Sequence, residues 1–223
     1  DEYKNVGSLK EPDFETIFGL KPDLIIISGR QASLYEEFKE IAPTIFMGVD
    51  TSNYMDSFKN NVTLLGEIFG KEDEVKEELE AVEETIQSIR NLAAAEDIKG
   101  LVVLTTGGKV SAYGPGSRFG IIHDEFGIAP VDESIDVSTH GMSVSFEYIL
   151  QQNPEYLFVI DRDAVVEEGA ETAKNVIEND LVKNTNAYKN GNIVYLDPNY
   201  WYLSGGGLVS VSEMANEIKA GLE

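Results

Sequence analysis

The chain has 223 residues, of which 42% are hydrophobic, and this is enough apolar material for one large domain or for two lobes with their own cores. Its formal net charge of −23 argues against nucleic acid and against an anionic membrane surface as the main partner. Cysteine is absent, which excludes disulfide bonds, thiolate metal sites and cysteine nucleophiles.

Runs of β-branched and aromatic residues, bounded by Gly, Pro or Asp, predict the strands. In chain order they lie at 23–28, 44–48, 101–106, 156–160 and 193–196. Segments with a helical period separate them, and this alternation predicts an α/β fold with mainly parallel sheets. No apolar run reaches the roughly 18 residues that would span a bilayer.

The segment from residue 71 to about 92 predicts one long amphipathic helix, which follows a shorter helical stretch at 54–69. Its apolar positions recur at spacings of 4, 3, 4 and 3, and they are Val75, Leu79, Val82, Ile86 and Ile89. At ~1.5 Å per residue the helix would be roughly 30 Å long or more. Between two lobes it would be a stiff connector, and the alternative is an ordinary surface helix packed on one sheet.

We therefore expect two Rossmann-like lobes joined by this helix. The expected parts are an N-terminal lobe at 1–70, the connecting helix at 71–98 and a C-terminal lobe at 99–223. The last part has three strand signals, enough for a complete lobe. The first part has only two, which would leave sheet edges uncovered, so we expect a first lobe that is truncated at its N-terminal side.

A helix–turn–strand motif occurs twice without a gap. "FETIFGLKPDLIIISGR" at 14–30 is followed by "FEYILQQNPEYLFVIDR" at 146–162, so that Glu147 matches Glu15 and Arg162 matches Arg30. Helix and strand rules explain the shared Phe, Ile and Pro, but they do not require the same Glu and Arg. The motif predicts a duplicated lobe, and the alternative is two generic units that happen to align.

Arginines follow several predicted strands, at the edge where parallel sheets bind ligands. Arg30 and Arg162 end the two copies of the motif, and Arg118 lies in the Gly-rich segment "AYGPGSRFG" at 112–120. Only 17 residues are Lys or Arg, so cations that converge in this acidic chain indicate an anion site. Arginine suits a large delocalised anion because its guanidinium stays charged, forks to oxygens and stacks on rings.

Aromatic and glycine residues meet in "DPNYWYLSGGGLVSVSEM" at 197–214, where Tyr200, Trp201 and Tyr202 are expected in a loop after the last strand. Such a loop is a typical ligand site in α/β folds. The glycines at 205–207 could offer backbone N–H groups to an anion, although tight contact between loop and helix is the favoured interpretation, and no nucleotide-phosphate motif is present. Of the two histidines, His123 favours a structural role, whereas His140 lies in a polar loop that favours function.

Taken together, "NVGSLKEPDFETIFGLKPDLIIIS", "SVSFEYILQQNPEYLFVIDRD" and "YWYLSGGG" make the chain resemble the ferric-siderophore substrate-binding proteins of ABC importers, within the class III periplasmic binding proteins. The resemblance covers nearly the whole chain and is strongest to members that bind petrobactin-like and other catecholate siderophores. It implies a monomeric, extracytoplasmic, non-enzymatic protein that holds a ferric siderophore between two lobes and has no catalytic cofactor. Family members carry a lipoprotein signal, an anchor Cys and the first strands before this sequence begins.

The resemblance also implies roles for particular residues. The siderophore contacts would be Arg30, Arg118, Arg162, Tyr200 and Trp201, and the iron ligands would be His140 and Tyr202, with Tyr200 as the alternative to Tyr202. Glu15 and Glu147 would dock the two lobes onto a permease dimer. Fe³⁺ is a hard ion that prefers catecholate and phenolate oxygens and accepts imidazole, so a tetradentate siderophore leaves positions for one Tyr and one His.

Two other functions stay open. A haem- or cobalamin-binding protein of the same class would share the fold and the Glu residues. An α/β enzyme would use His140 as a general base beside Asp136 or Glu147. The enzyme is disfavoured because the sequence has no nucleophile elbow, no nucleotide loop and no cysteine.

Overall fold

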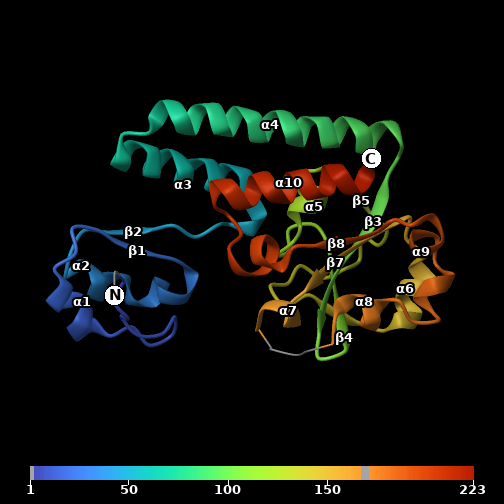
Figure 1. The fold of residues 1–223 in the computed structure, drawn as a ribbon, viewed down its shortest axis with the longest axis horizontal. Helices are drawn as coiled ribbons and strands as arrows, with labels where there is room; N and C mark the ends of the chain where they lie inside the picture. The colour runs from blue at the N-terminus through green and yellow to red at the C-terminus, as the bar shows by residue number, and fades with distance from the viewer. Residues whose placement is uncertain (1–2, 167–170) are drawn as a thin grey trace. The chain divides into compact units, whose positions relative to one another are not determined.

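The computed structural model describes residues 3–166 and 171–223, and the chain divides into two compact units. Unit 1 is Asp1–Val49 and unit 2 is Asp50–Glu223. Helices and strands alternate in both units, which confirms the predicted α/β class (Figure 1). In the described parts of the chain, no helix combines the length and the apolar character that crossing a membrane requires.

Unit 1 is built on two parallel strands that match the predicted runs at 23–28 and 44–48. Its elements are α1 (Phe14–Leu20), β1 (Ile25–Ile27), a 3₁₀-helix (Gly29–Leu34), α2 (Tyr35–Lys39) and β2 (Thr44–Phe46). Ile17, Ile27 and Phe38 form its small core, and the ring of Phe14 lies 4.9 Å from that of Phe38. The aromatic contact thus joins α1 and α2.

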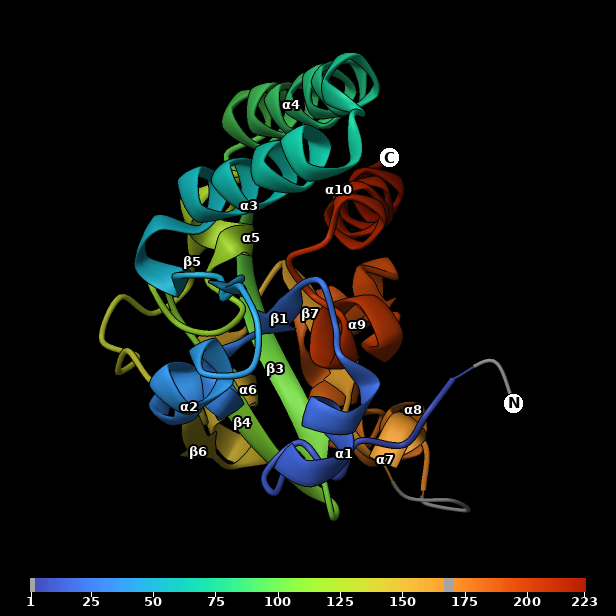
Figure 2. The same ribbon diagram turned by 90° about the vertical axis from the view of Figure 1, so that its left-hand side faces the viewer.

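Unit 2 contains the remaining elements, and its α-helices and strands are labelled in Figures 1 and 2. They are a 3₁₀-helix (Thr51–Asn53), α3 (Tyr54–Phe69), α4 (Glu72–Ala95), β3 (Lys99–Thr106), β4 (Lys109–Tyr113), α5 (Ile121–Asp124), β5 (Ala129–Pro130), β6 (Met142–Val144), α6 (Phe146–Gln152), β7 (Tyr156–Asp161), α7 (Asp163–Val166), α8 (Ala173–Ile177), a 3₁₀-helix (Val182–Asn184), α9 (Asn186–Asn190), β8 (Ile193–Leu196), a π-helical turn (Asn199–Leu203) and α10 (Leu208–Leu222). The predicted strands at 101–106, 156–160 and 193–196 are confirmed as β3, β7 and β8.

The sheet of unit 2 has the strand order β6-β4-β3-β7-β8, and β5 pairs with the start of β3. β3, β7 and β8 are parallel, as predicted, whereas β4 and β6, which pair in antiparallel fashion, were not predicted. Since Thr105 pairs with Asp161, the carboxyl ends of β3 and β7 lie side by side. This edge positions the candidate site.

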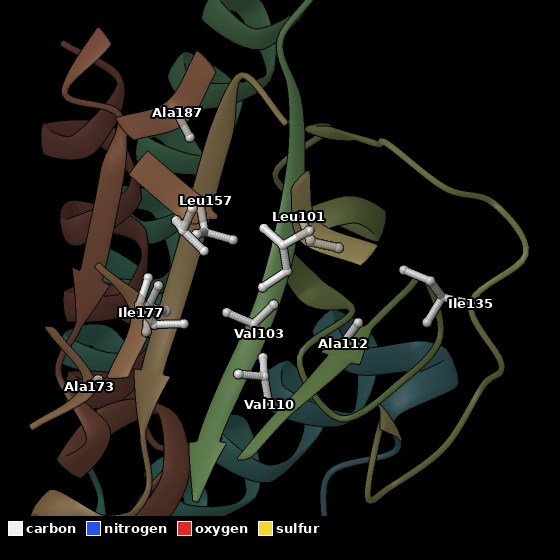
Figure 3. Close-up of a cluster of buried hydrophobic side chains, with 12 residues drawn as sticks. Leu101, Val103, Val110, Ala112, Ile135, Leu157, Ala173, Ile177 and Ala187 are labelled. Carbon is white, nitrogen blue, oxygen red and sulfur yellow. The ribbon is translucent and has the colours of Figure 1, made fainter. Parts of the chain in front are cut away.

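Alternating residues of the central strands fill the two faces of that sheet. Leu101 and Val103 of β3 and Leu157 of β7 belong to a buried cluster with residues of α6, α8 and α9 (Figure 3). Val102 and Phe158 alternate with them, are fully buried and face the opposite side of the sheet. The sheet is therefore covered on both faces, as a parallel α/β sheet must be.

The helices α3, α4 and α10 form a layer within unit 2 (Figures 1 and 2). Phe58 and Val62 of α3 are buried, and Gly66 lets α3 approach Val75 of α4, since a Cβ at Gly66 would lie 3.0 Å from that side chain. The long helix is confirmed, but it joins α3 to β3 and all three elements belong to unit 2. The apolar face of α3 packs on α4, which places α3 in unit 2, and the expected division into parts at 1–70, 71–98 and 99–223 stays a prediction.

The duplicated motif has the same local structure in both copies. An N-cap side chain accepts a hydrogen bond from the first turn of each helix, Asp13 in α1 and Ser145 in α6. Each helix then ends at a residue in the left-handed conformation, Lys21 (φ 50°) or Asn153 (φ 44°), whose N–H bonds a carbonyl of the last turn. The parallel strand begins a few residues later, so the repeat seen in the sequence is a repeat of structure.

Candidate functional site

Two arginines and one tyrosine of unit 2 meet, although they come from three separate segments. Arg162 directly follows β7, Arg118 lies in the loop after β4, and Tyr202 lies in the π-helical turn after β8. Arg162 Nε donates to the Tyr202 hydroxyl over 2.9 Å, and Arg118 Nη2 donates to the Tyr202 carbonyl oxygen over 2.7 Å. We call Arg118, Arg162 and Tyr202 the arginine–tyrosine cluster.

The tyrosine ring also contacts both cations through its π-face. The guanidinium carbon of Arg118 lies 4.3 Å from the ring centroid of Tyr202, and that of Arg162 lies 5.8 Å from it. Both distances are within the range of a cation–π interaction. Arg118 was expected to follow a parallel strand, but it follows the antiparallel β4, and its loop brings it back to the cluster.

The arginines change the acidity of the tyrosine. Burial acts to raise the pKa of Tyr202, but hydrogen bonds and positive charge from Arg162 and Arg118 outweigh it and hold that pKa below its ordinary value. Tyr113 lies behind the cluster, where burial raises its pKa while the charge of Arg118 opposes the increase. The exposed part of the site thus offers positive charge and a phenol that is more easily ionised than usual.

The three aromatic residues of the turn point to different surroundings. Tyr200 is partly buried, whereas Trp201 is 3% exposed and donates its indole N–H to Glu217 of α10 over 2.7 Å. The role of Trp201 as a siderophore contact stays a prediction. Its contact with α10 anchors the turn that carries Tyr202.

The glycines at 205–207 pack against helices. Gly206 has φ 93° and bonds the hydroxyl of Tyr54 in α3, and burial raises the pKa of that phenol to about 12. Gly207 precedes α10 and donates its N–H to Ser210 over 3.0 Å. The favoured interpretation, tight contact between loop and helix, is therefore confirmed.

The two histidines lie in different surroundings. His123 is buried, its Nδ1 lies 2.8 Å from the carbonyl oxygen of Ile128, and burial lowers its pKa, so its role is structural. His140 is exposed, and its backbone N–H bonds the Ser138 hydroxyl over 3.1 Å. The next residue, Gly141, has φ 73° and touches the Tyr113 ring behind the cluster, since an added Cβ would lie 2.7 Å from it.

The remaining predicted residues lie on the surface. Arg30 is exposed in unit 1, within the 3₁₀-helix Gly29–Leu34. Glu15 and Glu147 are exposed in the first turns of α1 and α6. The pKa of Glu147 lies below its ordinary value, because its own backbone N–H and the Ser145 hydroxyl stabilise the carboxylate.

Sequence reasoning missed the groups that hold Arg162 in place. Arg162 Nη1 donates to the Thr106 hydroxyl over 3.0 Å and to Asp163 Oδ1 over 3.2 Å. The sequence shows that Asp163 directly follows Arg162. It does not show that Asp163 is buried, because this burial depends on the pairing of β3 with β7.

Residues 1–200 match the model of the periplasmic binding protein family. The chain belongs to this family. It is 55% identical to the petrobactin-binding protein YclQ of Bacillus subtilis over all of its own length and 70% of that relative, and 32% identical to the ferric-anguibactin-binding protein FatB of Vibrio anguillarum over all of its length and 72% of that one. The family predicted from the sequence is confirmed, and the chain is a binding protein and not an enzyme.

Solved structures agree with this assignment. The crystal structure of YclQ matches with a TM-score of 0.92 over 99% of this chain and 77% of that one. The periplasmic catecholate-siderophore binding protein VctP of Vibrio cholerae, 39% identical, matches with a TM-score of 0.93 over 99% of this chain and 79% of that one. The fold of the periplasmic binding proteins is therefore established for this chain.

Proposed function

We propose that this protein captures a ferric catecholate siderophore outside the cytoplasm and delivers it to the permease of an ABC importer. The observation that carries the proposal is the arginine–tyrosine cluster, which concentrates two of the chain's few cations around one phenol. The similarity to proteins named for petrobactin, anguibactin and catecholate siderophores supports the class of ligand.

The chemistry of the cluster suits an anionic aromatic ligand. A ferric catecholate carries negative charge on oxygens attached to flat rings. Guanidinium groups donate to such oxygens and stack on such rings, so Arg118 and Arg162 supply both interactions. The chain has 40 acidic residues and only 17 Lys or Arg residues, so two arginines at one site distinguish that site from the rest of the chain.

We infer that Tyr202 and His140 complete the coordination of iron when the siderophore does not fill it. The lowered pKa of Tyr202 favours the phenolate, which is a hard oxygen ligand for Fe³⁺, and the exposed imidazole of His140 is an acceptable second ligand. Arg30, Tyr200 and Trp201 remain predicted siderophore contacts. A hexadentate siderophore would need no protein ligand, and the arginines alone would then hold it.

We further infer that the protein is a monomer which docks on a permease dimer through Glu15 and Glu147. Both residues begin the helix of a duplicated motif and both are exposed. The lowered pKa of Glu147 keeps its carboxylate charged and ready to pair with a cationic residue of the partner. A binding protein with a repeated acidic helix fits a permease with two related halves.

The test is a titration of the protein with a ferric catecholate and with a ferric hydroxamate, followed by the fluorescence of Trp201. This is the single tryptophan of the chain, and its neighbour Tyr202 belongs to the cluster. We expect the catecholate to quench the emission at lower concentration than the hydroxamate. Arg118→Ala and Arg162→Ala should weaken the catecholate complex, whereas Lys219→Ala, at the end of α10, should not.

Equal or stronger binding of the hydroxamate would refute the catecholate assignment. Visible spectra of the loaded protein add a second criterion, because a ferric catecholate gives a broad charge-transfer band and haem gives a sharp Soret band. A Soret band on incubation with haem, without any response to the catecholate, would assign the protein to haem instead.

A further inference from the structure

A buried carboxylate lies behind the arginine–tyrosine cluster. Asp163 is 6% exposed and begins α7 at the carboxyl edge of the sheet. Its Oδ1 accepts from the Thr106 hydroxyl over 3.0 Å and from Arg162 Nη1 over 3.2 Å, and its Oδ2 accepts from the backbone N–H of Gly107. Arg162 Nη1 also donates to the Thr106 hydroxyl, so the three side chains form a closed set of hydrogen bonds.

The pairing of the strands creates this arrangement. The backbone N–H of Arg162 continues the ladder between β7 and β3 by donating to the Thr105 carbonyl oxygen over 3.2 Å. Asp163 is the next residue and therefore reaches the turn at 107–108 that follows β3. Burying a carboxylate is costly unless it is paired and hydrogen-bonded. In the described part of the chain, the hydrogen bonds of the Asp163 carboxylate go to Thr106, to Gly107 and to Arg162. Arg162 is therefore the positive charge that pairs with it.

The guanidinium of Arg162 is held from two sides as a result. Nη1 is engaged by Asp163 and Thr106, and Nε is directed at the Tyr202 hydroxyl. Within the part of the chain that the structure describes, Nη2 has no protein partner, and the Arg162 side chain is 37% exposed. An arginine with free rotamers would lose much of its conformational entropy on binding, and one held in this way has already lost it.

We propose that Asp163 is a positioning residue, which holds the Arg162 guanidinium so that Nε stays on the Tyr202 hydroxyl and the free edge meets the anionic ligand. The part that concerns the ligand rests on the function proposed above, whereas the part that concerns Tyr202 does not. Asp163 bonds Nη1 of Arg162, whereas Tyr202 is bonded by Nε of the same guanidinium. Asp163 therefore acts on Tyr202 and on the ligand only through Arg162.

A change in the position of the Arg162 guanidinium would be seen at its own Nε–H group. In the present arrangement Nε donates to the Tyr202 hydroxyl over 2.9 Å, and an N–H group that donates a hydrogen bond exchanges its proton slowly with water. Loss of the support at Nη1 would leave Nε free to turn away from that hydroxyl, and its proton would then exchange faster.

The experiment compares Asp163→Asn with Asp161→Asn. Asp161 is two residues earlier, and its carboxylate accepts from the backbone N–H groups of Ala164 and Ala173 and not from Arg162. Both changes remove one charge and keep an oxygen acceptor. The exchange of the Arg162 Hε proton with water is measured by NMR on ¹⁵N-labelled protein, with the signal assigned through Arg162→Gln.

We expect Asp163→Asn to speed the exchange of the Arg162 Hε proton about tenfold, which corresponds to the loss of about one hydrogen bond. Asp161→Asn should leave the exchange rate unchanged. An unchanged rate in the Asp163→Asn variant, with the fold intact by Trp201 emission, would overturn the proposal.

The effect of Asp163 on ligand binding is tested with the ferric complex of 2,3-dihydroxybenzoate as the probe. Asp163→Asn should weaken its binding about tenfold, as expected when a charged hydrogen bond is no longer held in place. Unchanged affinity for the probe in that variant would overturn the part of the proposal that concerns the ligand. If the wild-type protein did not bind the probe, the proposed function would fail, and faster exchange of the Arg162 Hε proton in Asp163→Asn would still establish Asp163 as the support of Arg162.

Discussion

The pair of Trp201 and Glu217 gives a sharp test of how the site is held, because it anchors the turn that carries Tyr202. The perturbation is Glu217→Gln compared with Glu217→Met, two side chains of similar length. Gln keeps an oxygen acceptor for the indole N–H, and Met does not. Glu217 also accepts from the backbone N–H of Asp197 at 3.3 Å, so both donors lose their partner in the Met variant.

The expected magnitude follows from the burial of the tryptophan. Trp201 is 3% exposed, so water cannot easily replace the lost acceptor. A buried donor without a partner costs about 1–3 kcal/mol, and we expect Glu217→Met to be less stable than Glu217→Gln by this amount. In a unit of this size that difference corresponds to roughly 2–4 °C in Tm for each kcal/mol.

The comparison of Glu217→Gln with the wild type depends on pH. Burial raises the pKa of Glu217 above its ordinary value of 4.5, with the charges of Asp197 and Glu213 adding to it, while bonds from Trp201 and Asp197 only partly oppose the rise. A raised folded-state pKa contributes stability that is complete below 4.5 and is lost as the pH rises through the folded value. The Gln variant carries no such charge, so its stability relative to wild type should increase from pH 4.5 upward and level off.

Urea unfolding followed by tryptophan emission measures both comparisons. The chain has one tryptophan, so the signal reports unit 2 specifically. Equal stabilities of the Gln and Met variants within about 0.5 kcal/mol would show that Glu217 does not support the indole. Parallel pH curves for the wild type and Glu217→Gln would show that burial does not penalise the carboxylate.

Further substitutions test docking, coordination and the core. Replacing Glu15 and Glu147 together with Ala should leave siderophore affinity unchanged and lower uptake by cells more than about tenfold, since pairs with the permease would be lost; a large loss of affinity would contradict a docking role. His140→Ala should weaken a tetradentate ferric catecholate about tenfold and leave a hexadentate one unchanged, measured by the same fluorescence titration, and equal losses would exclude coordination. Ile149→Ala, at a position with 0% exposure, should lower the free energy of unfolding by about 2–5 kcal/mol, whereas Val209→Ala, at 68% exposure, should change it by less than about 0.5 kcal/mol in the same urea experiment; similar effects of the two would contradict the assigned core.

The long elements could be predicted because periodicity alone specifies them. α3 and α4 bury one apolar stripe each, and β3, β7 and β8 are apolar runs bounded by turn residues. β4 was missed although the sequence carried its signal. Gly107 and Gly108, both with positive φ, form a two-residue turn between Thr106 and Lys109, which is a hairpin pattern.

Other features could not be predicted because they depend on partners distant in sequence. β5 and β6 are two and three residues long, and they are strands only because β3 and β4 pair with them. The sequence shows the apolar stripe on α3. It does not show that this stripe packs on α4, which places α3 in unit 2. A periodic pattern reports that a face is buried and does not report against what.

The candidate site was partly predictable for a similar reason. Strand ends and turn composition identified Arg118, Arg162 and Tyr202 individually, since ligands in α/β folds lie at the ends of parallel strands. Their mutual contacts depend on the tertiary structure. The π-helical turn, closed by the bond from Ser204 N–H to the Asn199 carbonyl oxygen over 2.9 Å, sends neighbouring aromatic side chains to different sides. Trp201 is therefore buried while Tyr202 meets the arginines.

The charge of the whole chain explains why the cluster must act at contact distance. A surface with a net charge of −23 repels an anionic complex, but at physiological ionic strength screening confines exposed charges to about 8 Å. Recognition of an anion then depends on donors that touch it and on their orientation. Asp163 subtracts charge from the site and yet fixes Arg162, while Tyr202 accepts from both arginines. In a site that attracts anions only by its electrostatic field, a buried carboxylate behind the arginine would weaken binding. In a site that selects its ligand by the positions of the ligand oxygens, the same carboxylate favours binding because it orients the arginine.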